Sequence, residues 1–451
     1  MPHQQSKTID AARAAVHRAL SHQAELFPEL DLAPLDTSTL SPRDAAFAHA
    51  IYDTVLRRWI TLAYLIDGYT SRGFGALDPR VRAVLLAGAA QLLLLDKVPP
   101  HAALNESVEW TKSTLPKAAG LVNAVLRRIS ELVHAQPSGL PEPRARTPWT
   151  DSRDLLPLPD GTAVQLRQPV LPQDPLERLE VASSCPLYLL RKWTTDFGDA
   201  QARNLALHAL LSPPTILHTR FATAEVPHTQ PHNDPAHRVY TGRREELTAL
   251  LDDRPDLWVQ DAASSRAVTT PLPRPPRLIL DLCAGQGTKT RQFARTYPAA
   301  RIIATDIDPR RLRALRHVAG REPTIEVIDP ASTSTFRAQA DLILLDVPCT
   351  NTGVLPRRVE ARYRCGPAQL ARLVATQRQI LTDALSLLAP HGNILFSTCS
   401  LEPEENEQQL DWAKSLKLTA SHIHRTMPSS LPGDPPSTYS DAAFSALLAR
   451  A

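Results

Sequence analysis

The 451-residue chain is poor in glycine, with 16 Gly against 41 Pro. An average protein holds about 7% Gly and about 5% Pro, so this chain inverts the usual order. Much of the backbone is therefore expected to turn at rigid residues instead of flexible ones. About half of the Pro residues fall between residues 135 and 280, which predicts a stiff, turn-rich middle segment.

Cysteine and long apolar runs are scarce as well. Five Cys is an odd number at low density, which excludes a disulfide scaffold and indicates a reducing compartment. The polar start of the chain contains no apolar core, so we expect no secretory signal. The longest apolar stretch, 83–95, is interrupted by Gly88 and Gln91 and falls short of the roughly 20 residues of a membrane helix. We expect a cytoplasmic protein with no membrane partner.

Neither sign of charge is in large excess, since 50 Lys and Arg stand against 47 Asp and Glu, for a net charge of +3. Only eight of the 50 basic residues are Lys. Arg carries a planar fork that suits phosphate and stacks on bases, but an Arg bias also follows from genomic composition. Charge alone therefore does not predict nucleic-acid binding. The length predicts two to four domains with ample core.

The chain divides into regions of different pattern. Residues 1–135 repeat apolar residues at three- and four-residue spacing, which predicts an all-helical domain. Residues 136–179 are rich in Pro and indicate a linker, and residues 180–260 indicate a small mixed α+β domain. Residues 261–451 alternate apolar strands with helices, which predicts a parallel sheet buried on both faces.

A loop in the small middle domain gathers three histidines, His228, His232 and His237. A metal site would need a fourth ligand and a tight framework, and neither is visible in the sequence. We therefore expect no metal.

The first strand of the C-terminal region ends in a turn with two glycines, Gly285 and Gly287. Glycine lets the backbone approach a ligand, and the following helix start offers free N–H groups. Asp306 ends the next strand, 19 residues after Gly287, where an acid can receive ribose hydroxyls. No phosphate-loop motif is present, which disfavours ATP and GTP. The pattern predicts a nucleotide-type cofactor.

Two later strands end in cysteine motifs. Asp346-Val-Pro-Cys349-Thr follows one strand, and Ser397-Thr-Cys399-Ser follows another. Carboxyl ends of parallel strands share one edge, where ligands bind, so both thiols can face one pocket. A lone Cys is usually a small core residue, and we interpret Cys185 and Cys365 in that way.

These motifs resemble those of the RsmB (Sun) group of S-adenosylmethionine-dependent RNA cytosine-5 methyltransferases, which act on small-subunit ribosomal RNA. The paired Pro-Cys and Thr-Cys motifs are the most specific part of the resemblance. Segments 98–109 and 120–128 resemble the NusB-like helical domain of that group, an RNA-binding module. Segment 258–264 resembles the opening of its catalytic domain, and segment 441–448 resembles its closing strand.

The resemblance implies a multidomain fold. An all-α NusB-like domain is expected in 1–135, followed by a Pro-rich linker in 136–179 and a small α+β RNA-binding subdomain in 180–260. An α/β Rossmann-like methyltransferase domain is expected in 261–451. The resemblance also implies S-adenosylmethionine as cofactor and 16S ribosomal RNA as partner, and we expect a monomer.

The resemblance also implies roles for individual residues. Carbon 5 of cytosine is a poor nucleophile, so a thiolate must first add to carbon 6. In this group Cys399 corresponds to that nucleophile, Asp346 contacts the N3 edge of the base, and Cys349 serves product release. The implied cofactor-binding residues are Cys283, Ala284, Gly285, Gln286, Gly287, Thr288, Lys289, Asp306, Asp329 and Asp346.

A basic segment follows the Pro-Cys motif. Arg357, Arg358, Arg362 and Arg364 lie within eight residues, and we expect them to hold the phosphates of the flipped strand. The competing interpretation is a solvated basic loop.

The chain departs from the group at two turns. Its first turn reads Cys-Ala-Gly-Gln-Gly-Thr-Lys-Thr where the group usually has Cys-Ala-Ala-Pro-Gly-Gly-Lys-Thr. Ile328 and Pro330 flank Asp329 where the group usually has two glycines. These changes leave open a non-catalytic RNA-binding or ribosome-assembly factor with a degenerate cofactor site. A transfer RNA cytosine-5 methyltransferase is the other alternative, against which the NusB-like domain argues.

Overall fold

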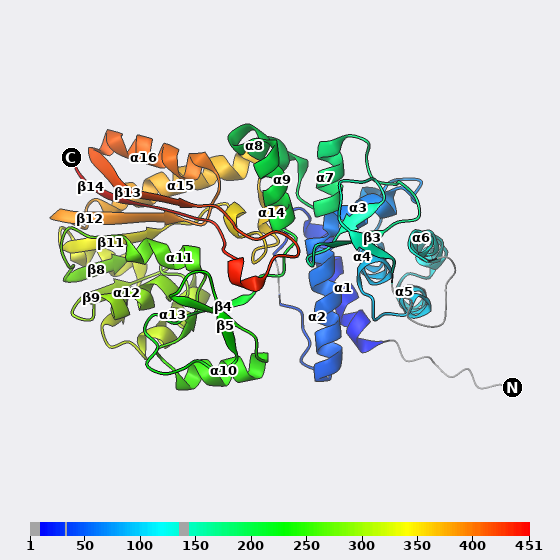
Figure 1. Cartoon of the computed structure of the whole chain (residues 1–451), viewed down its shortest axis with the longest axis horizontal. Helices are drawn as coiled ribbons and strands as arrows, with labels where there is room; N and C mark the ends of the chain where they lie inside the picture. Colours follow the sequence, from blue (N-terminus) through cyan, green and yellow to red (C-terminus); the bar gives the residue numbers. More distant parts are fainter. Residues whose placement is uncertain (1–9, 32–33, 135–143) are drawn as a thin grey trace. The chain divides into compact units, whose positions relative to one another are not determined.

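A computed structural model describes residues 10–31, 34–134 and 144–451 (Figure 1). The chain forms two compact units. The first comprises Met1–Leu211 together with Arg362–Arg364 and Leu431–Gly433, and the second comprises Ser212–Ala361, Cys365–Ser430 and Asp434–Ala451. No helix in the described ranges is long and apolar enough to cross a membrane.

The first unit begins with helices packed around α4. These helices are α1 (Ala11–Leu26), α2 (Pro42–Arg57), α3 (Trp59–Asp67), α4 (Pro79–Leu94), α5 (Pro100–Thr114) and α6 (Ala119–Glu131). Every residue of α4 from Ala83 to Leu93 is buried, and α4 contacts each of the other five helices. Helix α6 approaches closely at Gly88, where an added Cβ would lie 2.6 Å from a methyl carbon of Leu126. The all-helical prediction for the N-terminal region is confirmed for the described residues.

Proline opens several of the helices. A Pro stands at the first position of α2, α4 and α5, and of α7 (Pro175–Ser183), α13 (Pro309–Ala319) and α15 (Pro367–Ala384). The first helical N–H has no intrahelical partner, and the fixed φ of Pro suits this position. Part of the Pro excess therefore marks helix starts.

The segment 144–179, which the sequence predicts to be a linker, is instead folded. It contains a three-stranded antiparallel sheet in the order β1-β3-β2, from β1 (Arg146–Pro148), β2 (Leu155–Pro157) and β3 (Thr162–Gln165). Arg144 fixes its start, because the buried guanidinium donates to the carbonyls of Gln91 and Leu92 at 2.5 and 2.6 Å. Strands of three or four residues are too short to show a clear alternation of apolar and polar residues. The Pro content of the segment therefore indicates a linker in the sequence. The remainder of the predicted linker, 136–143, lies outside the described residues.

The predicted middle domain, 180–260, is divided between the units. Helices α8 (Leu187–Phe197) and α9 (Asp199–His208) belong to the first unit. The second unit starts with an antiparallel sheet in the order β5-β6-β4-β7, from β4 (Thr215–His218), β5 (Thr229–Pro231), β6 (His237–Tyr240) and β7 (Trp258–Val259). Helix α10 (Arg244–Asp253) follows β6.

The main sheet of the second unit has the order β10-β9-β8-β11-β12-β14-β13. Its strands are β8 (Leu278–Asp281), β9 (Arg301–Ala304), β10 (Ile325–Val327), β11 (Ala340–Asp346), β12 (Leu388–Thr398), β13 (Leu418–Thr426) and β14 (Ala443–Arg450). Strands β8 to β12 pair in parallel, while β14 is antiparallel to both of its neighbours. Successive strands move in opposite directions from the β8–β11 boundary, which makes this boundary the switch point where ligands of such sheets bind.

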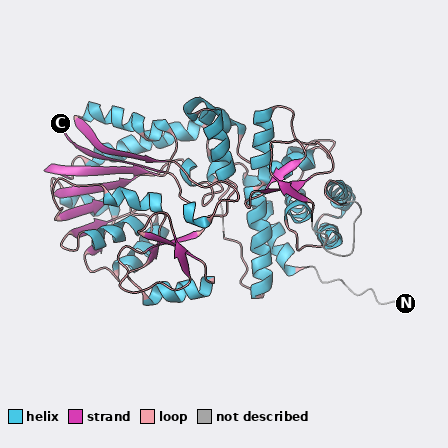
Figure 2. Cartoon of the chain, viewed as in Figure 1, coloured by secondary structure: helices cyan, strands magenta, loops and turns pink. Residues whose placement is uncertain are grey.

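Helices cover both faces of this sheet (Figure 2). One face packs against α12 (Thr288–Thr296) and α13, and the other against α15 and α16 (Glu407–Ala413). Adjacent strand residues alternate between the two cores: Ile279 and Leu342 belong to one, and Leu280 and Ile343 to the other. Burial on both faces accounts for the continuous apolar runs in the sequence. The predicted α/β fold is confirmed.

Two of the four arginines expected to hold RNA phosphate are occupied within the protein. Arg362 is fully buried, and its guanidinium donates to the carbonyls of Ala209 at 2.6 Å and Arg57 at 3.2 Å. Arg357 pairs with Asp441 at 2.6 Å and with Asp261 at 3.4 Å. The expectation is therefore wrong for Arg357 and Arg362, whose donors are used to join distant segments.

We expect Arg362→Ala to lower the free energy of unfolding by a few kcal/mol, because each buried carbonyl that loses its donor costs about 1–3 kcal/mol. Urea unfolding of the full chain measures this loss. Arg358→Ala is the matched control, since that side chain is 55% exposed and its loss should change stability by less than about 0.5 kcal/mol. Equal stability of the two variants would contradict a structural role for Arg362.

Candidate active site

The carboxyl ends of the parallel strands bring the predicted residues to one edge of the sheet. Asp281 pairs with Leu344 of β11 and with Ala304 of β9, and Asp346 pairs with Ser397 of β12. The loops that leave these four strands are therefore neighbours. Asp346 is the last residue of β11, and the other predicted site residues lie in these loops, just after the end of β10, or at the start of α12.

The turn after β8 is built around two glycines with left-handed backbone conformations. Gly285 has φ +58° and Gly287 has φ +88°. At Gly287 an added Cβ would lie 2.8 Å from a methyl carbon of Leu315 in α13, whereas at Gly285 it would meet no atom within 4 Å. Gly287 therefore permits close packing of two helices, while Gly285 leaves backbone open to a ligand.

Hydrogen bonds fix this turn to the end of β9. The amide of Gly285 donates to the Asp306 carboxylate at 2.9 Å, and the amide of Ala284 donates to the Thr305 carbonyl at 3.0 Å. Asp306 is 4% exposed, and the apolar side chain of Ile307 beside it is 87% exposed. An acid and an exposed apolar residue thus adjoin the open glycine.

The remaining residues of the predicted cofactor set occupy the same edge. Thr288 begins α12, and Gln286 is exposed at the tip of the turn. Burial raises the pKa of the Cys283 thiol, which keeps this side chain neutral. Asp329 is exposed at the end of β10, where its carboxylate accepts a hydrogen bond from the Ala331 amide at 2.9 Å.

Lys289 links the cofactor turn to the cysteine loops. Its ammonium donates to the Asp346 carboxylate at 2.7 Å. Burial by itself would lower the pKa of Lys289, but Asp346 and, more weakly, Cys399 raise it overall. A lysine cation is therefore retained beside the second thiol motif.

The two predicted thiols are in direct contact. Cys349 Sγ lies 3.4 Å from Cys399 Sγ, although 50 residues separate them in the sequence. Cys399 is partly exposed and Cys349 is buried. The contact with Cys399, burial and the charge of Glu405 together raise the pKa of Cys349 well above its ordinary value.

The structure adds residues that the sequence reasoning did not assign to the site. Asn351 has a left-handed backbone with φ +60°, a conformation that Asn tolerates better than most residues. Its amide group donates to the Cys349 carbonyl at 2.8 Å and accepts a hydrogen bond from Cys399 Sγ at 3.2 Å. Asp281 and Glu405 are further buried acids of this region. The position of Asp281 at the end of an apolar run could have indicated it, whereas the polar residues before Glu405 give no such signal.

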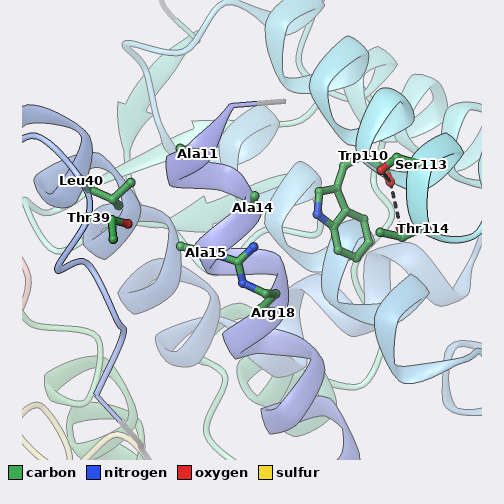
Figure 3. A pocket seen from close by; sticks show the side chains of 9 residues that line it. All are labelled: Ala11, Ala14, Ala15, Arg18, Thr39, Leu40, Trp110, Ser113 and Thr114. Carbon is green, nitrogen blue, oxygen red and sulfur yellow. Dashed lines mark hydrogen bonds between the residues drawn. The ribbon is translucent and has the colours of Figure 1, made fainter. Parts of the chain in front are cut away.

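A cavity in the first unit lies apart from the predicted site residues. A cavity of about 420 Å³ in the first unit is lined by Trp110 of α5, Arg18 of α1 and seven further residues (Figure 3). None of the predicted site residues lines it.

Over the ranges described, no three or more His, Cys, Asp or Glu side chains group in a way that could hold a metal ion. Of the three histidines of the middle loop, His237 pairs with Asp234 at 3.0 Å, and His232 contacts the Tyr439 carbonyl at 2.8 Å.

Two family models match the chain. The model described as 16S rRNA methyltransferase RsmB/F matches residues 269–431, and the NusB family model matches residues 7–131. The first match contains both cysteine motifs and the glycine turn. The second covers the helices of the N-terminal region.

Curated relatives are similar over most of the chain. The ribosomal RNA small subunit methyltransferase B of Escherichia coli O6:K15:H31 is 30% identical over 388 residues, which covers 84% of this chain and 83% of the relative. The protein of the same name from Vibrio cholerae serotype O1 is 29% identical over 409 residues, or 88% of each chain. Among solved structures, that of PH0851 aligns with a TM-score of 0.69 at 19% identity over 97% of this chain and 98% of its own. This last likeness shows the fold.

Asp281 allows a test of the electrostatics of this site. Burial, opposed by a hydrogen bond from Thr290 and reinforced by Asp346, raises the pKa of Asp281 from 3.8 to about 7. A raised carboxyl pKa destabilises the folded chain increasingly as pH rises from the unfolded to the folded value. Asp281→Asn should therefore be neutral near pH 3.8 and stabilise the ligand-free chain above pH 7, by on the order of 4 kcal/mol.

Thermal unfolding of both proteins between pH 5 and pH 8.5 measures this dependence. Asp329→Asn is the control, because that exposed carboxyl lies on the same edge and its replacement should alter stability little at any pH. A constant difference between wild type and Asp281→Asn across the range would contradict the raised pKa.

Proposed function

The chain belongs to the RsmB/F family of 16S rRNA methyltransferases, and we propose that it methylates carbon 5 of a cytosine in small-subunit ribosomal RNA through a covalent enzyme–RNA adduct. The observation that carries this proposal is the pair of thiols 3.4 Å apart at the ends of β11 and β12. One thiol suffices for a nucleophile. A second thiol in contact with it gives the same centre a group that can exchange a proton.

The loops at the ends of β8 and β9 fit S-adenosylmethionine, which supplies an electrophilic methyl group carried on a sulfonium centre. The open face of Gly285 accepts a close approach of the ligand, and the Asp306 carboxylate suits ribose hydroxyls. The exposed side chain of Ile307 offers an apolar surface for a planar base. We propose Cys283, Ala284, Gln286, Thr288, Lys289, Asp329 and Asp346 as the rest of the cofactor shell.

The altered residues of the two turns do not disturb this geometry. The turn with Gln286 and Thr288 holds two left-handed glycines, Gly285 and Gly287. Ile328 donates its amide to the Ala304 carbonyl at 3.1 Å, and Pro330 opens the short helix that follows Asp329. These observations favour a working cofactor turn over the degenerate one that a non-catalytic assembly factor would have.

In the proposed reaction, Cys399 attacks first. Its thiolate forms a bond to carbon 6 of the flipped cytosine, and the electron pair of the 5,6 double bond becomes available at carbon 5. Asp346 contacts the N3 edge and stabilises the adduct. Lys289, held by Asp346 at 2.7 Å, keeps a positive charge beside these groups while the negative charge moves from sulfur to the base.

Release follows once carbon 5 carries the new methyl group. Cys349 first loses its own proton to water and then, as a thiolate, takes the proton from carbon 5. The released pair restores the 5,6 double bond, and the bond between carbon 6 and Cys399 breaks to return the Cys399 thiolate. Because the two sulfur atoms are 3.4 Å apart, Cys349 as the proton acceptor and Cys399 as the nucleophile can act on the same cytosine ring. Extrusion of the cytosine from its stack costs a few kcal/mol before any of these steps.

The thiols make distinct predictions. With labelled S-adenosylmethionine and unmethylated small-subunit rRNA, Cys399→Ala should show no methyl transfer, because no adduct can form. Cys349→Ala should accumulate a covalent protein–RNA complex that survives denaturing electrophoresis, because release is blocked. Cys365→Ala, which alters a buried thiol outside the motifs, is the matched control and should transfer methyl groups like wild type.

Methyl transfer by Cys399→Ala equal to that of wild type would overturn the proposal, and adduct accumulation by Cys399→Ala instead of Cys349→Ala would reverse the two roles. RNA binding without cofactor binding in calorimetry would support the assembly-factor alternative. Transfer to transfer RNA but not to rRNA would support the other alternative. A cytoplasmic location and a monomeric state stay predictions.

A further inference from the structure

A buried carboxylate next to the thiols has no part in the reaction as described. Glu405 is fully buried in the short helix Pro403–Glu405, which follows the loop of Cys399. Its carboxylate accepts hydrogen bonds from the Thr350 amide at 3.0 and 3.1 Å and from the Thr350 hydroxyl at 2.5 Å. We infer that Glu405 is a positioning residue that holds Cys349 for product release and adjusts its strength as a base.

Glu405 and Gln377 together fix the backbone on both sides of Cys349. The Gln377 amide group donates to the Pro348 carbonyl at 3.0 Å and to Glu405 at 2.9 Å. Thr350 on the other side is bound by Glu405 directly. Pro348 is therefore held by Gln377, and Thr350 is held by Glu405. The side chains of Thr350, Gln377 and Glu405 are all buried.

The loop of Cys399 is joined to the same network. The hydroxyl of Ser400 lies 3.0 Å from that of Thr350, and the Gly353 amide donates to the Cys399 carbonyl at 3.0 Å. An added Cβ at Gly353 would lie 2.6 Å from that carbonyl oxygen, so the two loops meet without space between them. The distance between the sulfur atoms is thus set by buried hydrogen bonds.

The charge of Glu405 acts on Cys349 as well. Burial raises the pKa of Glu405, but the donors around it, including Thr350 and Gln377, require an acceptor and so favour the carboxylate. The titratable groups that face Cys349 are Cys399 and Glu405, whereas Lys289 and Asp346 interact with each other near Cys399.

The difference between the groups that face Cys349 and those near Cys399 matters at the release step. The inference here rests on the proposed function. Once Cys399 is bonded to carbon 6, its sulfur is a neutral thioether and no longer influences Cys349 by charge. Glu405 is then the remaining anion that faces Cys349. A nearby negative charge raises the pKa of a thiol and makes its thiolate a stronger base. Glu405 therefore determines the basicity of Cys349 when the proton on carbon 5 must be removed.

The test is the pH dependence of adduct release in the full-length enzyme. A pre-formed adduct with small-subunit rRNA is chased in single-turnover experiments between pH 6.5 and pH 10, and formation and release are measured separately. Glu405→Gln removes the charge but keeps the volume and one acceptor oxygen. We expect its release profile to shift to lower pH by ~1 unit, with a lower plateau rate and unchanged adduct formation. Glu404→Gln, one residue earlier in the same short helix, is the matched control and should release like wild type.

A second variant covers the case in which Glu405→Gln does not fold. Thr350→Val removes the hydroxyl with its 2.5 Å bond to Glu405 and its contacts with Ser400 and Thr352, but keeps the amide bonds to the Glu405 carboxylate. It should slow release at every pH without a shift of the profile. A merely structural role would lower thermal stability and slow formation and release together. Wild-type release by folded Glu405→Gln at every pH would overturn the inference, as would the same shift in Glu404→Gln. The proposed function fails separately, if Cys349→Ala traps no adduct.

Discussion

Asp346 of β11 lies opposite Ser397 of β12 in the parallel register, and Cys349 and Cys399 follow these residues by three and two positions. Because both strands run in the same direction, their loops leave the sheet at the same edge and meet there. A slip of one residue in this pairing would turn one loop to the other face of the sheet. The thiol contact, the ion pair of Lys289 and the anchoring of Thr350 all presuppose that register. The burial of both sheet faces fixes it, because every alternate side chain has a core to fill.

The glycines at this edge lie where a side chain would clash or where the backbone is left-handed. Gly287 and Gly353 lie where a side chain would meet Leu315 or the backbone of Cys399, and Gly285 leaves backbone uncovered at the cofactor turn. Proline provides the stiffness elsewhere, since in the described part of the chain it opens six α-helices, whose first amide needs no partner. The unusual ratio of the two residues therefore reflects separate local requirements at turns and at helix starts.

The sequence allowed prediction of the features that depend on short stretches. The glycine turn of Gly285 and Gly287 and the strand-end motifs at Asp346 and Ser397 indicated the parallel sheet and the common edge, and the helical periodicity indicated the N-terminal helices. Features that depend on distant partners were missed or misjudged. Arg362 looked like a phosphate ligand because only the fold shows that it meets the carbonyls of Arg57 and Ala209. Glu405 lies 55 residues after Thr350, and no local pattern connects them. The strands of 144–179 are too short to alternate visibly, so their prolines suggested a linker.

The segment Arg362–Arg364 belongs to the first unit although its neighbours in the sequence belong to the second. The same is true of the segment Leu431–Gly433. The buried guanidinium of Arg362 donates hydrogen bonds to two carbonyls of the first unit, whose main part ends at Leu211. During synthesis this unit is therefore incomplete when its first 211 residues have emerged from the ribosome, and its final contacts form only after residue 433 has been added. The first unit thus completes its packing only after residues 212–430, most of which belong to the second unit, have been made.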